Sequence, residues 1–119
     1  MKKVLVVDDE ASVRQVVVIA LKKWGYQVFE AEDGVDGIKM IERCKPDIVI
    51  TDLTMPGMRG EEVINFVKTK PKMQDIKIIA FSGEYELETV ARAAGCDDFI
   101  QKPFDIFLLK EKVARLLAE

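Results

Sequence analysis

Histidine is absent from this 119-residue sequence, and cysteine occurs only twice. The missing imidazole excludes histidine nucleophiles, histidine acid–base catalysis and histidine metal ligands. A metal site in this chain would therefore use oxygen ligands, which favours Mg²⁺, Mn²⁺ or Ca²⁺. Cys44 and Cys96 lie too far apart for a close-spaced metal motif. Isolated cysteines of this kind are typical of small buried side chains in a reducing cytosol, so we expect a cytoplasmic protein.

Long apolar runs are also missing. None approaches the roughly 20 residues of a membrane span, and the apolar run after Met1–Lys3 stops at two aspartates, unlike a secretion signal. Basic runs of five or more do not occur, and the formal net charge is −3. The charge pattern therefore predicts no direct binding to nucleic acid or to an anionic membrane surface.

Strand and helix patterns alternate along the whole chain, which fits one domain over residues 1–119. Apolar residues at helical spacing predict five helices, centred on residues 13–24, 38–41, 63–67, 87–94 and 106–117. Short aliphatic runs predict five strands at residues 3–7, 26–31, 48–51, 76–81 and 98–101. Five strand–helix units predict an α/β fold, a doubly wound parallel sheet in the order 2-1-3-4-5 covered by five helices.

Carboxylates follow two of these strands. Asp8 and Asp9 end the first strand, and Asp52 ends the third, which is its neighbour in the predicted order. Open α/β sheets bind ligands at the carboxyl ends of their strands. Carboxylates brought together there repel each other unless a cation gathers them. The pattern therefore predicts an acidic site for Mg²⁺, with Mn²⁺ as a second choice.

Two further polar groups come from the same edge of the predicted sheet. The fourth strand ends at Ser82 and the fifth at Lys102. A carboxylate such as Asp52 can attack phosphorus and form an acyl phosphate. A metal ion, the Lys102 ammonium and the Ser82 hydroxyl could stabilise charge on the transferred group. The predicted edge therefore suits phosphoryl transfer.

Four motifs occur in order: Asp8-Asp9, Asp52 with Met55-Pro56-Gly57, Ser82-Gly83 and Lys102-Pro103-Phe104. Together they resemble the receiver domain of bacterial two-component response regulators, over essentially the whole chain. The resemblance implies a flavodoxin-like receiver fold with Asp52 as phosphoacceptor. It also implies a metal held by Asp8, Asp9 and Asp52, with the backbone carbonyl of Thr54.

The same resemblance implies roles for the remaining residues. Lys102 would pair with the phosphoryl oxygens and be aimed by a cis bond before Pro103, while Ser82 would contact the phosphoryl group. Phe99 would be the switch aromatic, acting by shape alone because it carries no hydroxyl. The readout would be a repacked face formed by the fourth helix, fifth strand and fifth helix.

The resemblance further implies partners. The phosphodonor would be a histidine kinase or a phosphotransfer protein, and the output would be an unknown protein or a fused effector domain. The chain would be a stand-alone receiver or one domain of a longer protein, monomeric or dimerising on phosphorylation. It would be a regulatory phosphoacceptor and not a turnover enzyme.

Other interpretations of the same residues stay open at this point. Asp8-Asp9 and Ser82 could cap helices, Asp52 could shape a turn, Lys102 could be a surface lysine and Phe99 a core residue. A haloacid dehalogenase-type phosphohydrolase would need Asp-x-Asp-x-Thr where this chain has residues 8–12, DDEAS. A flavodoxin-like cofactor binder would need a Ser/Thr-rich loop there. A receiver that works only as an unphosphorylated binding module would share all the motifs.

Overall fold

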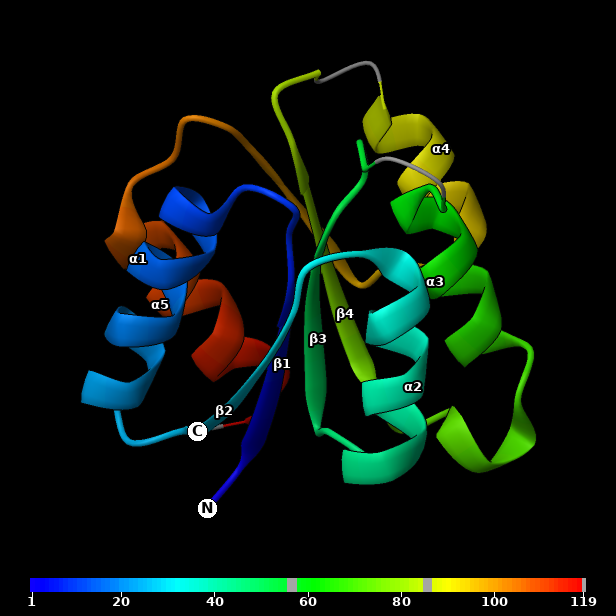
Figure 1. Ribbon diagram of the computed structural model, residues 1–119, viewed down its shortest axis with the longest axis horizontal. Coiled ribbons are helices and arrows are strands. Elements are labelled where there is room, and N and C mark those ends of the chain that lie inside the picture. The colour runs from blue at the N-terminus through cyan, green and yellow to red at the C-terminus, as the bar shows by residue number, and fades with distance from the viewer. Residues whose placement is uncertain (56–57, 85–86, 119) are drawn as a thin grey trace.

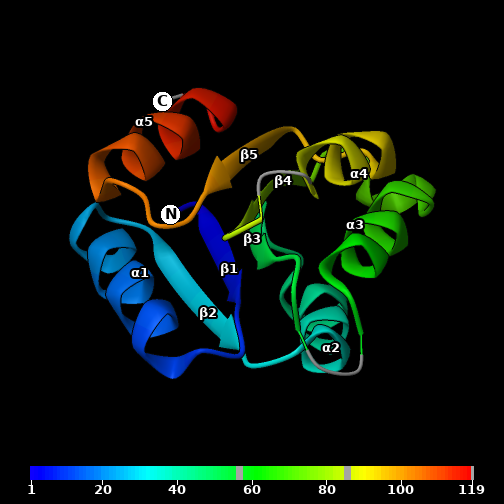
Figure 2. The ribbon, with the colours of Figure 1, turned by 90° about the horizontal axis from the view of Figure 1, so that it is seen from above.

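A computed structural model describes residues 1–55, 58–84 and 87–118. Five parallel strands form one sheet in the order β2-β1-β3-β4-β5, as the sequence predicts (Figure 1 and Figure 2). The predicted Pro56 and Gly57 of the loop after Asp52 lie outside the described residues. The strands are β1 (Lys3–Val7), β2 (Gln27–Ala31), β3 (Ile48–Asp52), β4 (Lys77–Ser82) and β5 (Asp98–Gln101).

Helices cover both faces of the sheet. One face carries α1 and α5, and the other carries α2, α3 and α4 (Figure 2). A short 3₁₀ turn, η1 (Pro71–Met73), precedes β4 and was not predicted from the sequence. The helices are α1 (Ala11–Lys23), α2 (Gly34–Cys44), α3 (Gly60–Lys68), α4 (Leu87–Ala94) and α5 (Ile106–Leu116).

The central strands are buried on both faces, which is why they read as continuous aliphatic runs. Alternate residues enter different cores. Leu5 and Val7 join the core under α2–α4, and Val4 and Val6 join the core under α1 and α5. The strands are thereby fixed in register, since a shift of one residue would exchange the two sets of side chains.

Glycines end two of the helices. Gly25 after α1 and Gly95 after α4 have φ angles of 95° and 110°, in the left-handed region that glycine adopts without a steric penalty. Both turns send the chain directly into the next strand. The helices therefore stop where the strands must begin.

A buried carboxylate at the start of β5 links the last elements. Asp98 is 4% exposed, and its oxygens accept hydrogen bonds from Lys112 at 2.9 and 3.0 Å, from Arg115 and, at 3.5 Å, from Arg92. Burial raises the pKa of Asp98, but the hydrogen bonds from Lys112 and from the Phe99 N–H outweigh it, so its pKa lies below the usual value. One carboxylate thus ties α4 and α5 to the edge strand.

Candidate functional site

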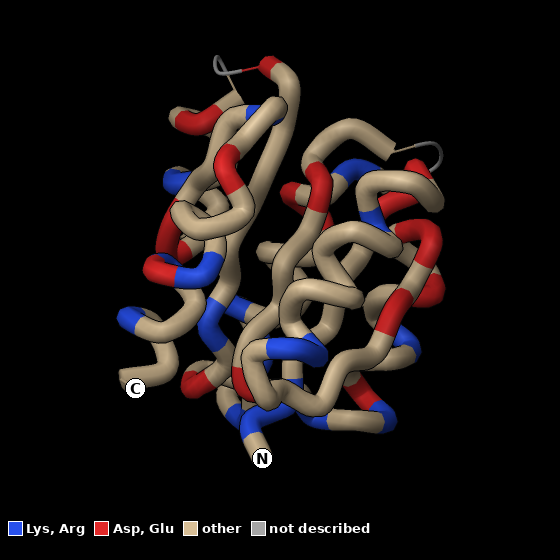
Figure 3. Tube along the Cα trace, turned by 90° about the vertical axis from the view of Figure 1, so that its left-hand side faces the viewer, with Lys and Arg blue, Asp and Glu red and all other residues tan. Residues whose placement is uncertain are grey.

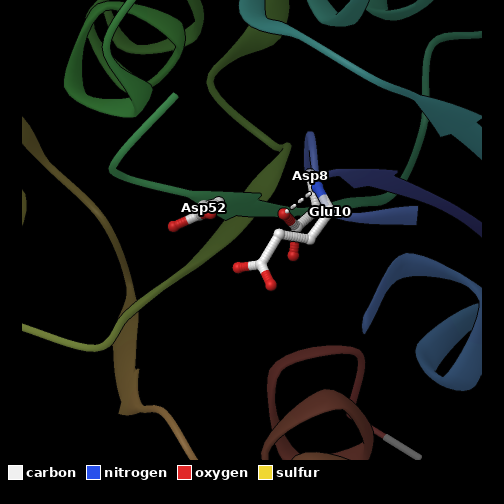
Figure 4. A group of neighbouring side chains, drawn as sticks. All are labelled: Asp8, Glu10 and Asp52. Atoms are coloured by element: carbon white, nitrogen blue, oxygen red, sulfur yellow. Dashed lines mark hydrogen bonds between the residues drawn. The ribbon is translucent and has the colours of Figure 1, made fainter. Parts of the chain in front are cut away.

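Three carboxylates meet at the carboxyl ends of β1 and β3. One oxygen from each of Asp8, Glu10 and Asp52 lies within 4.8 Å of the other two, and Figure 4 shows the three side chains projecting into the same space. Residue pairing places Val7 opposite Thr51, so Asp8 and Asp52 leave neighbouring strands at the same level. Acidic residues also mark several loops at this end of the molecule (Figure 3).

Asp8 is the most enclosed of the three carboxylates. It is fully buried, and its Oδ1 accepts a hydrogen bond of 3.0 Å from the Glu10 N–H. Burial raises the pKa of Asp8, the nearby Asp52 carboxylate raises it further, and the hydrogen bonds from Glu10 and Lys102 offset only part of this. A cation close to Asp8 would stabilise its ionised form against burial and against the repulsion from Asp52.

Lys102 extends into the acidic group from the loop after β5. Its Nζ lies 3.2 Å from Oδ2 of Asp8, 3.2 Å from Oδ2 of Asp52 and 3.5 Å from Oε1 of Glu10. The ammonium also lies 4.7 Å from the centre of the Phe81 ring. Burial lowers the pKa of Lys102, but Asp52 and Asp8 raise it more, so the net shift is upward and the ammonium stays charged. With its side chain only 16% exposed, Lys102 is not an ordinary surface lysine.

Asp52 and Ser82 are the last residues of their strands and not the first residues of the loops. Asp52 is 3% exposed, and its Oδ1 accepts a hydrogen bond of 3.2 Å from the Thr54 N–H. Ser82 is 1% exposed, and its Oγ accepts one of 3.0 Å from the Glu84 N–H. The Lys102 N–H donates to the Ser82 carbonyl at 2.8 Å, so the loop carrying Lys102 is held directly beside β4.

The remaining predicted residues occupy different positions. Asp9 is exposed and its carboxylate is not in the group formed by Asp8, Glu10 and Asp52, so its part in metal binding stays a prediction. Thr54 is exposed, and the role of its carbonyl also stays a prediction. The Lys102–Pro103 peptide bond is cis. Phe99 is 7% exposed and packs in the core under α2–α4, so its part as a switch stays a prediction.

Sequence reasoning missed two residues of the site. Glu10 follows the acidic pair, but only the turn into α1 brings its side chain back over the strand ends. Gly60 begins α3, where a Cβ would lie 2.0 Å from the carbonyl oxygen of Asp52 and 2.7 Å from Cα of Leu53. The chain can thus return this closely past Asp52 only at glycine. Neither role leaves a signal in local sequence.

The donor set fits a hard divalent cation. All side-chain ligands on offer are carboxylate oxygens, the ligands that Mg²⁺ takes in phosphate chemistry, usually one or two with several waters. The alternative that the acidic pair caps α1 is not what the structure contains, because the N-cap residue is Glu10 and its side chain makes no capping hydrogen bond. A metal-bound phosphoryl group beside Asp52 is chemically compatible with this arrangement.

Comparison with known proteins gives the family. Residues 4–114 match the model of the response regulator receiver domain. This chain belongs to that family. The receiver domain is a module of two-component signalling, and the comparison indicates no enzyme family. Within the described residues, no helix combines the length and apolar character needed to cross a membrane.

Solved structures agree with this assignment. The receiver domain is similar to the chemotaxis response regulator CheY4 of Vibrio cholerae, with 31% identity, a TM-score of 0.91 and 98% coverage of both chains. It is also similar to the response regulator TrrA of Thermotoga maritima, solved in complex with Mg²⁺–BeF, with 35% identity, a TM-score of 0.89 and coverage of 98% and 99%. A receiver domain of a signal transduction histidine kinase from Syntrophus aciditrophicus has 27% identity, a TM-score of 0.91 and coverage of 99% and 91%.

Proposed function

We propose that the receiver domain accepts a phosphoryl group onto Asp52 and uses it to change partner binding. The observation that carries the proposal is the position of the Asp52 carboxylate. It lies at a strand end, 3.2 Å from the Lys102 ammonium and within an all-oxygen acidic group. This arrangement provides a nucleophile and a fixed cation for the oxygens of an incoming phosphoryl group.

The donor would be the phosphohistidine of a histidine kinase or of a phosphotransfer protein, since this chain has no histidine of its own. An Asp52 oxygen would attack phosphorus as the P–N bond breaks, and the bonding electron pair would stay on the imidazole nitrogen. The product is an aspartyl phosphate on this chain. Mg²⁺, when bound, supplies positive charge that neutralises the phosphoryl oxygens.

The protein's own residues would do the remaining work. Asp8, with Asp52 and either Asp9 or Glu10, would hold the cation, and the Thr54 carbonyl is a further proposed ligand. Lys102 already lies between Asp8 and Asp52, so it could pair with phosphoryl oxygens after a short movement. Such positioning and charge stabilisation are most of what phosphoryl transfer requires.

The readout would begin at Ser82. Its Oγ, which now accepts a hydrogen bond from the Glu84 N–H, would turn towards the phosphoryl group. Phe99 would then move into the space that the Ser82 side chain leaves. The surface of α4, β5 and α5 would repack in response. A shift from 1:99 to 99:1 needs a preference of about 5.5 kcal/mol, within reach of a doubly charged group contacting a cation, a lysine and a hydroxyl. The output partner, a cytoplasmic location and dimerisation stay predictions.

Intact-mass measurement after incubation with Mg²⁺ and acetyl phosphate tests the proposal. Wild-type protein should gain the mass of one phosphoryl group, and Asp52→Asn should gain none. Asp75→Asn, the same change at an exposed position, is the matched control and should be labelled like wild type. An unlabelled wild type, alongside a labelled receiver of known activity, would exclude the proposal.

A further inference from the structure

Arg14 contacts the backbone of the acidic site from outside it. The residue lies in the first turn of α1, and its side chain is only 14% exposed. Its Nη1 donates to the carbonyl oxygen of Asp8 at 2.6 Å, and its Nε donates to Oε1 of Glu30 on β2 at 3.0 Å. One planar guanidinium thus joins the end of β1 to the neighbouring strand.

These contacts hold a part of the backbone that the sheet does not. The pairing of β1 with β3 ends at Val7, so the Asp8 carbonyl lies beyond that ladder. On the other side, the Asp8 N–H donates to the Ala31 carbonyl at 3.1 Å. The guanidinium therefore fixes the orientation of the peptide group between Asp8 and Asp9, two of the residues proposed as metal ligands.

We propose that Arg14, held by Glu30, is a positioning residue that sets the affinity of the acidic site for Mg²⁺. This inference rests on the proposed function, because it assumes that the site binds the cation. Arginine suits the task because its donors form a rigid fork, so one contact orients the other. Hydrogen bonds donated by a charged group are also stronger than those between neutral groups.

Charge alone predicts the opposite effect, which makes the inference testable. Removing a cation near three carboxylates should strengthen the binding of Mg²⁺. Loss of positioning should weaken it, and changes in residues that orient metal ligands typically cost 10- to 100-fold in metal affinity. The direction of the change in Kd therefore separates the two explanations.

Calorimetric titration with Mg²⁺ of the full chain, without a phosphodonor, measures this Kd. We expect Arg14→Gln to raise Kd by about 10-fold or more. Arg14→Lys keeps the charge but not the fork, so it should also bind weakly. The matched control is Arg43→Gln, because Arg43 is exposed and lines the same groove between α1, β2 and α2 as Arg14. The Kd of Arg43→Gln for Mg²⁺ should equal that of wild type or fall slightly.

Thermal unfolding in EDTA distinguishes positioning from a loss of stability. A variant with a lower Tm and an unchanged Kd would show that Arg14 only stabilises the fold, and a lowered Kd would show that only its charge matters. Either result would overturn the inference. If Arg14→Gln does not fold, Glu30→Gln decides, since the Glu30 side chain is 44% exposed and its substitution should disturb the fold less. Glu30→Gln should raise the Kd for Mg²⁺, and an unchanged Kd would refute the inference. Wild-type protein that binds no Mg²⁺ would refute the proposed function instead.

Discussion

Replacing Asp52, the proposed phosphoacceptor, should stabilise the metal-free protein, although the substitution removes an ion pair. In Asp52→Asn the pair with Lys102 at 3.2 Å is lost, and so is the repulsion from Asp8 and Glu10 within 4.8 Å. At an effective dielectric constant of about 20, the attraction amounts to about 5 kcal/mol and each repulsion to at least about 3.5 kcal/mol. The two repulsions together exceed the attraction by about 2 kcal/mol.

Solvent reduces this difference. The Glu10 side chain is 58% exposed, so its repulsion of Asp52 is partly screened. The amide oxygen introduced by the substitution can accept only one of the two hydrogen bonds, because Lys102 and the Thr54 N–H now donate to different oxygens of Asp52. We therefore expect Asp52→Asn to be more stable than wild type by about 1 kcal/mol in EDTA, equivalent to about 4 °C in Tm.

Urea unfolding with and without Mg²⁺ checks both the sign and its cause. Saturating Mg²⁺ should reverse the ranking, because the ion stabilises wild type by about 2.7 kcal/mol at 100 times its Kd and binds the variant more weakly. Asp75→Asn should change stability by less than about 0.5 kcal/mol. An Asp52→Asn protein that is less stable than wild type in EDTA would refute the reasoning, as would a difference that Mg²⁺ does not alter.

Three further predictions follow from the site and the fold. If Mg²⁺ binds to the group formed by Asp8, Glu10 and Asp52, Glu10→Gln should weaken its binding more than Asp9→Asn does. Calorimetry that finds the reverse order would show that Asp9 is the ligand and Glu10 is not. Because the folded pKa of Asp98 is lowered, its ionisation stabilises the fold fully above about pH 5 and this contribution is lost as the pH falls through the folded value. Asp98→Asn should thus cost about 2 kcal/mol at pH 7 and less at pH 3 in urea unfolding, and a cost independent of pH would contradict this. Gly60→Ala should destabilise the protein by about 3 kcal/mol or more, since the new methyl group meets backbone at 2.0 Å, and a wild-type midpoint in the same assay would show that α3 can shift freely.

Sequence predicted the sheet because its strands are aliphatic runs with clear ends. The β1 and β5 bounds agree with the prediction, and the other strands differ by one residue at one or both ends. These small differences have consequences, since Asp52 and Ser82 are held in the sheet ladder itself. Their backbones are therefore fixed by pairing with Phe81 and Gln101, in a way that a loop residue would not be.

The contacts that the sequence did not predict join side chains and backbone from different helices and strands. Glu10 enters the acidic group and Arg14 contacts the Asp8 carbonyl only because α1 turns back over the sheet. The requirement for Gly60 arises from the return path of the chain past Asp52. None of these contacts has a local pattern, because each joins residues whose closeness is a property of the tertiary structure.

The contact between Lys102 and Asp8 spans 94 positions of the chain, and the contact between Lys102 and Asp52 spans 50. During synthesis, the acidic residues therefore leave the ribosome long before the lysine that will lie between them. A nascent chain that ends before β5 would carry the carboxylates of Asp8 and Asp52 without this cation. Competence for phosphorylation would then appear only when the last strand joins the sheet. The time at which Asp52 becomes labelled would therefore report when this final step of folding occurs.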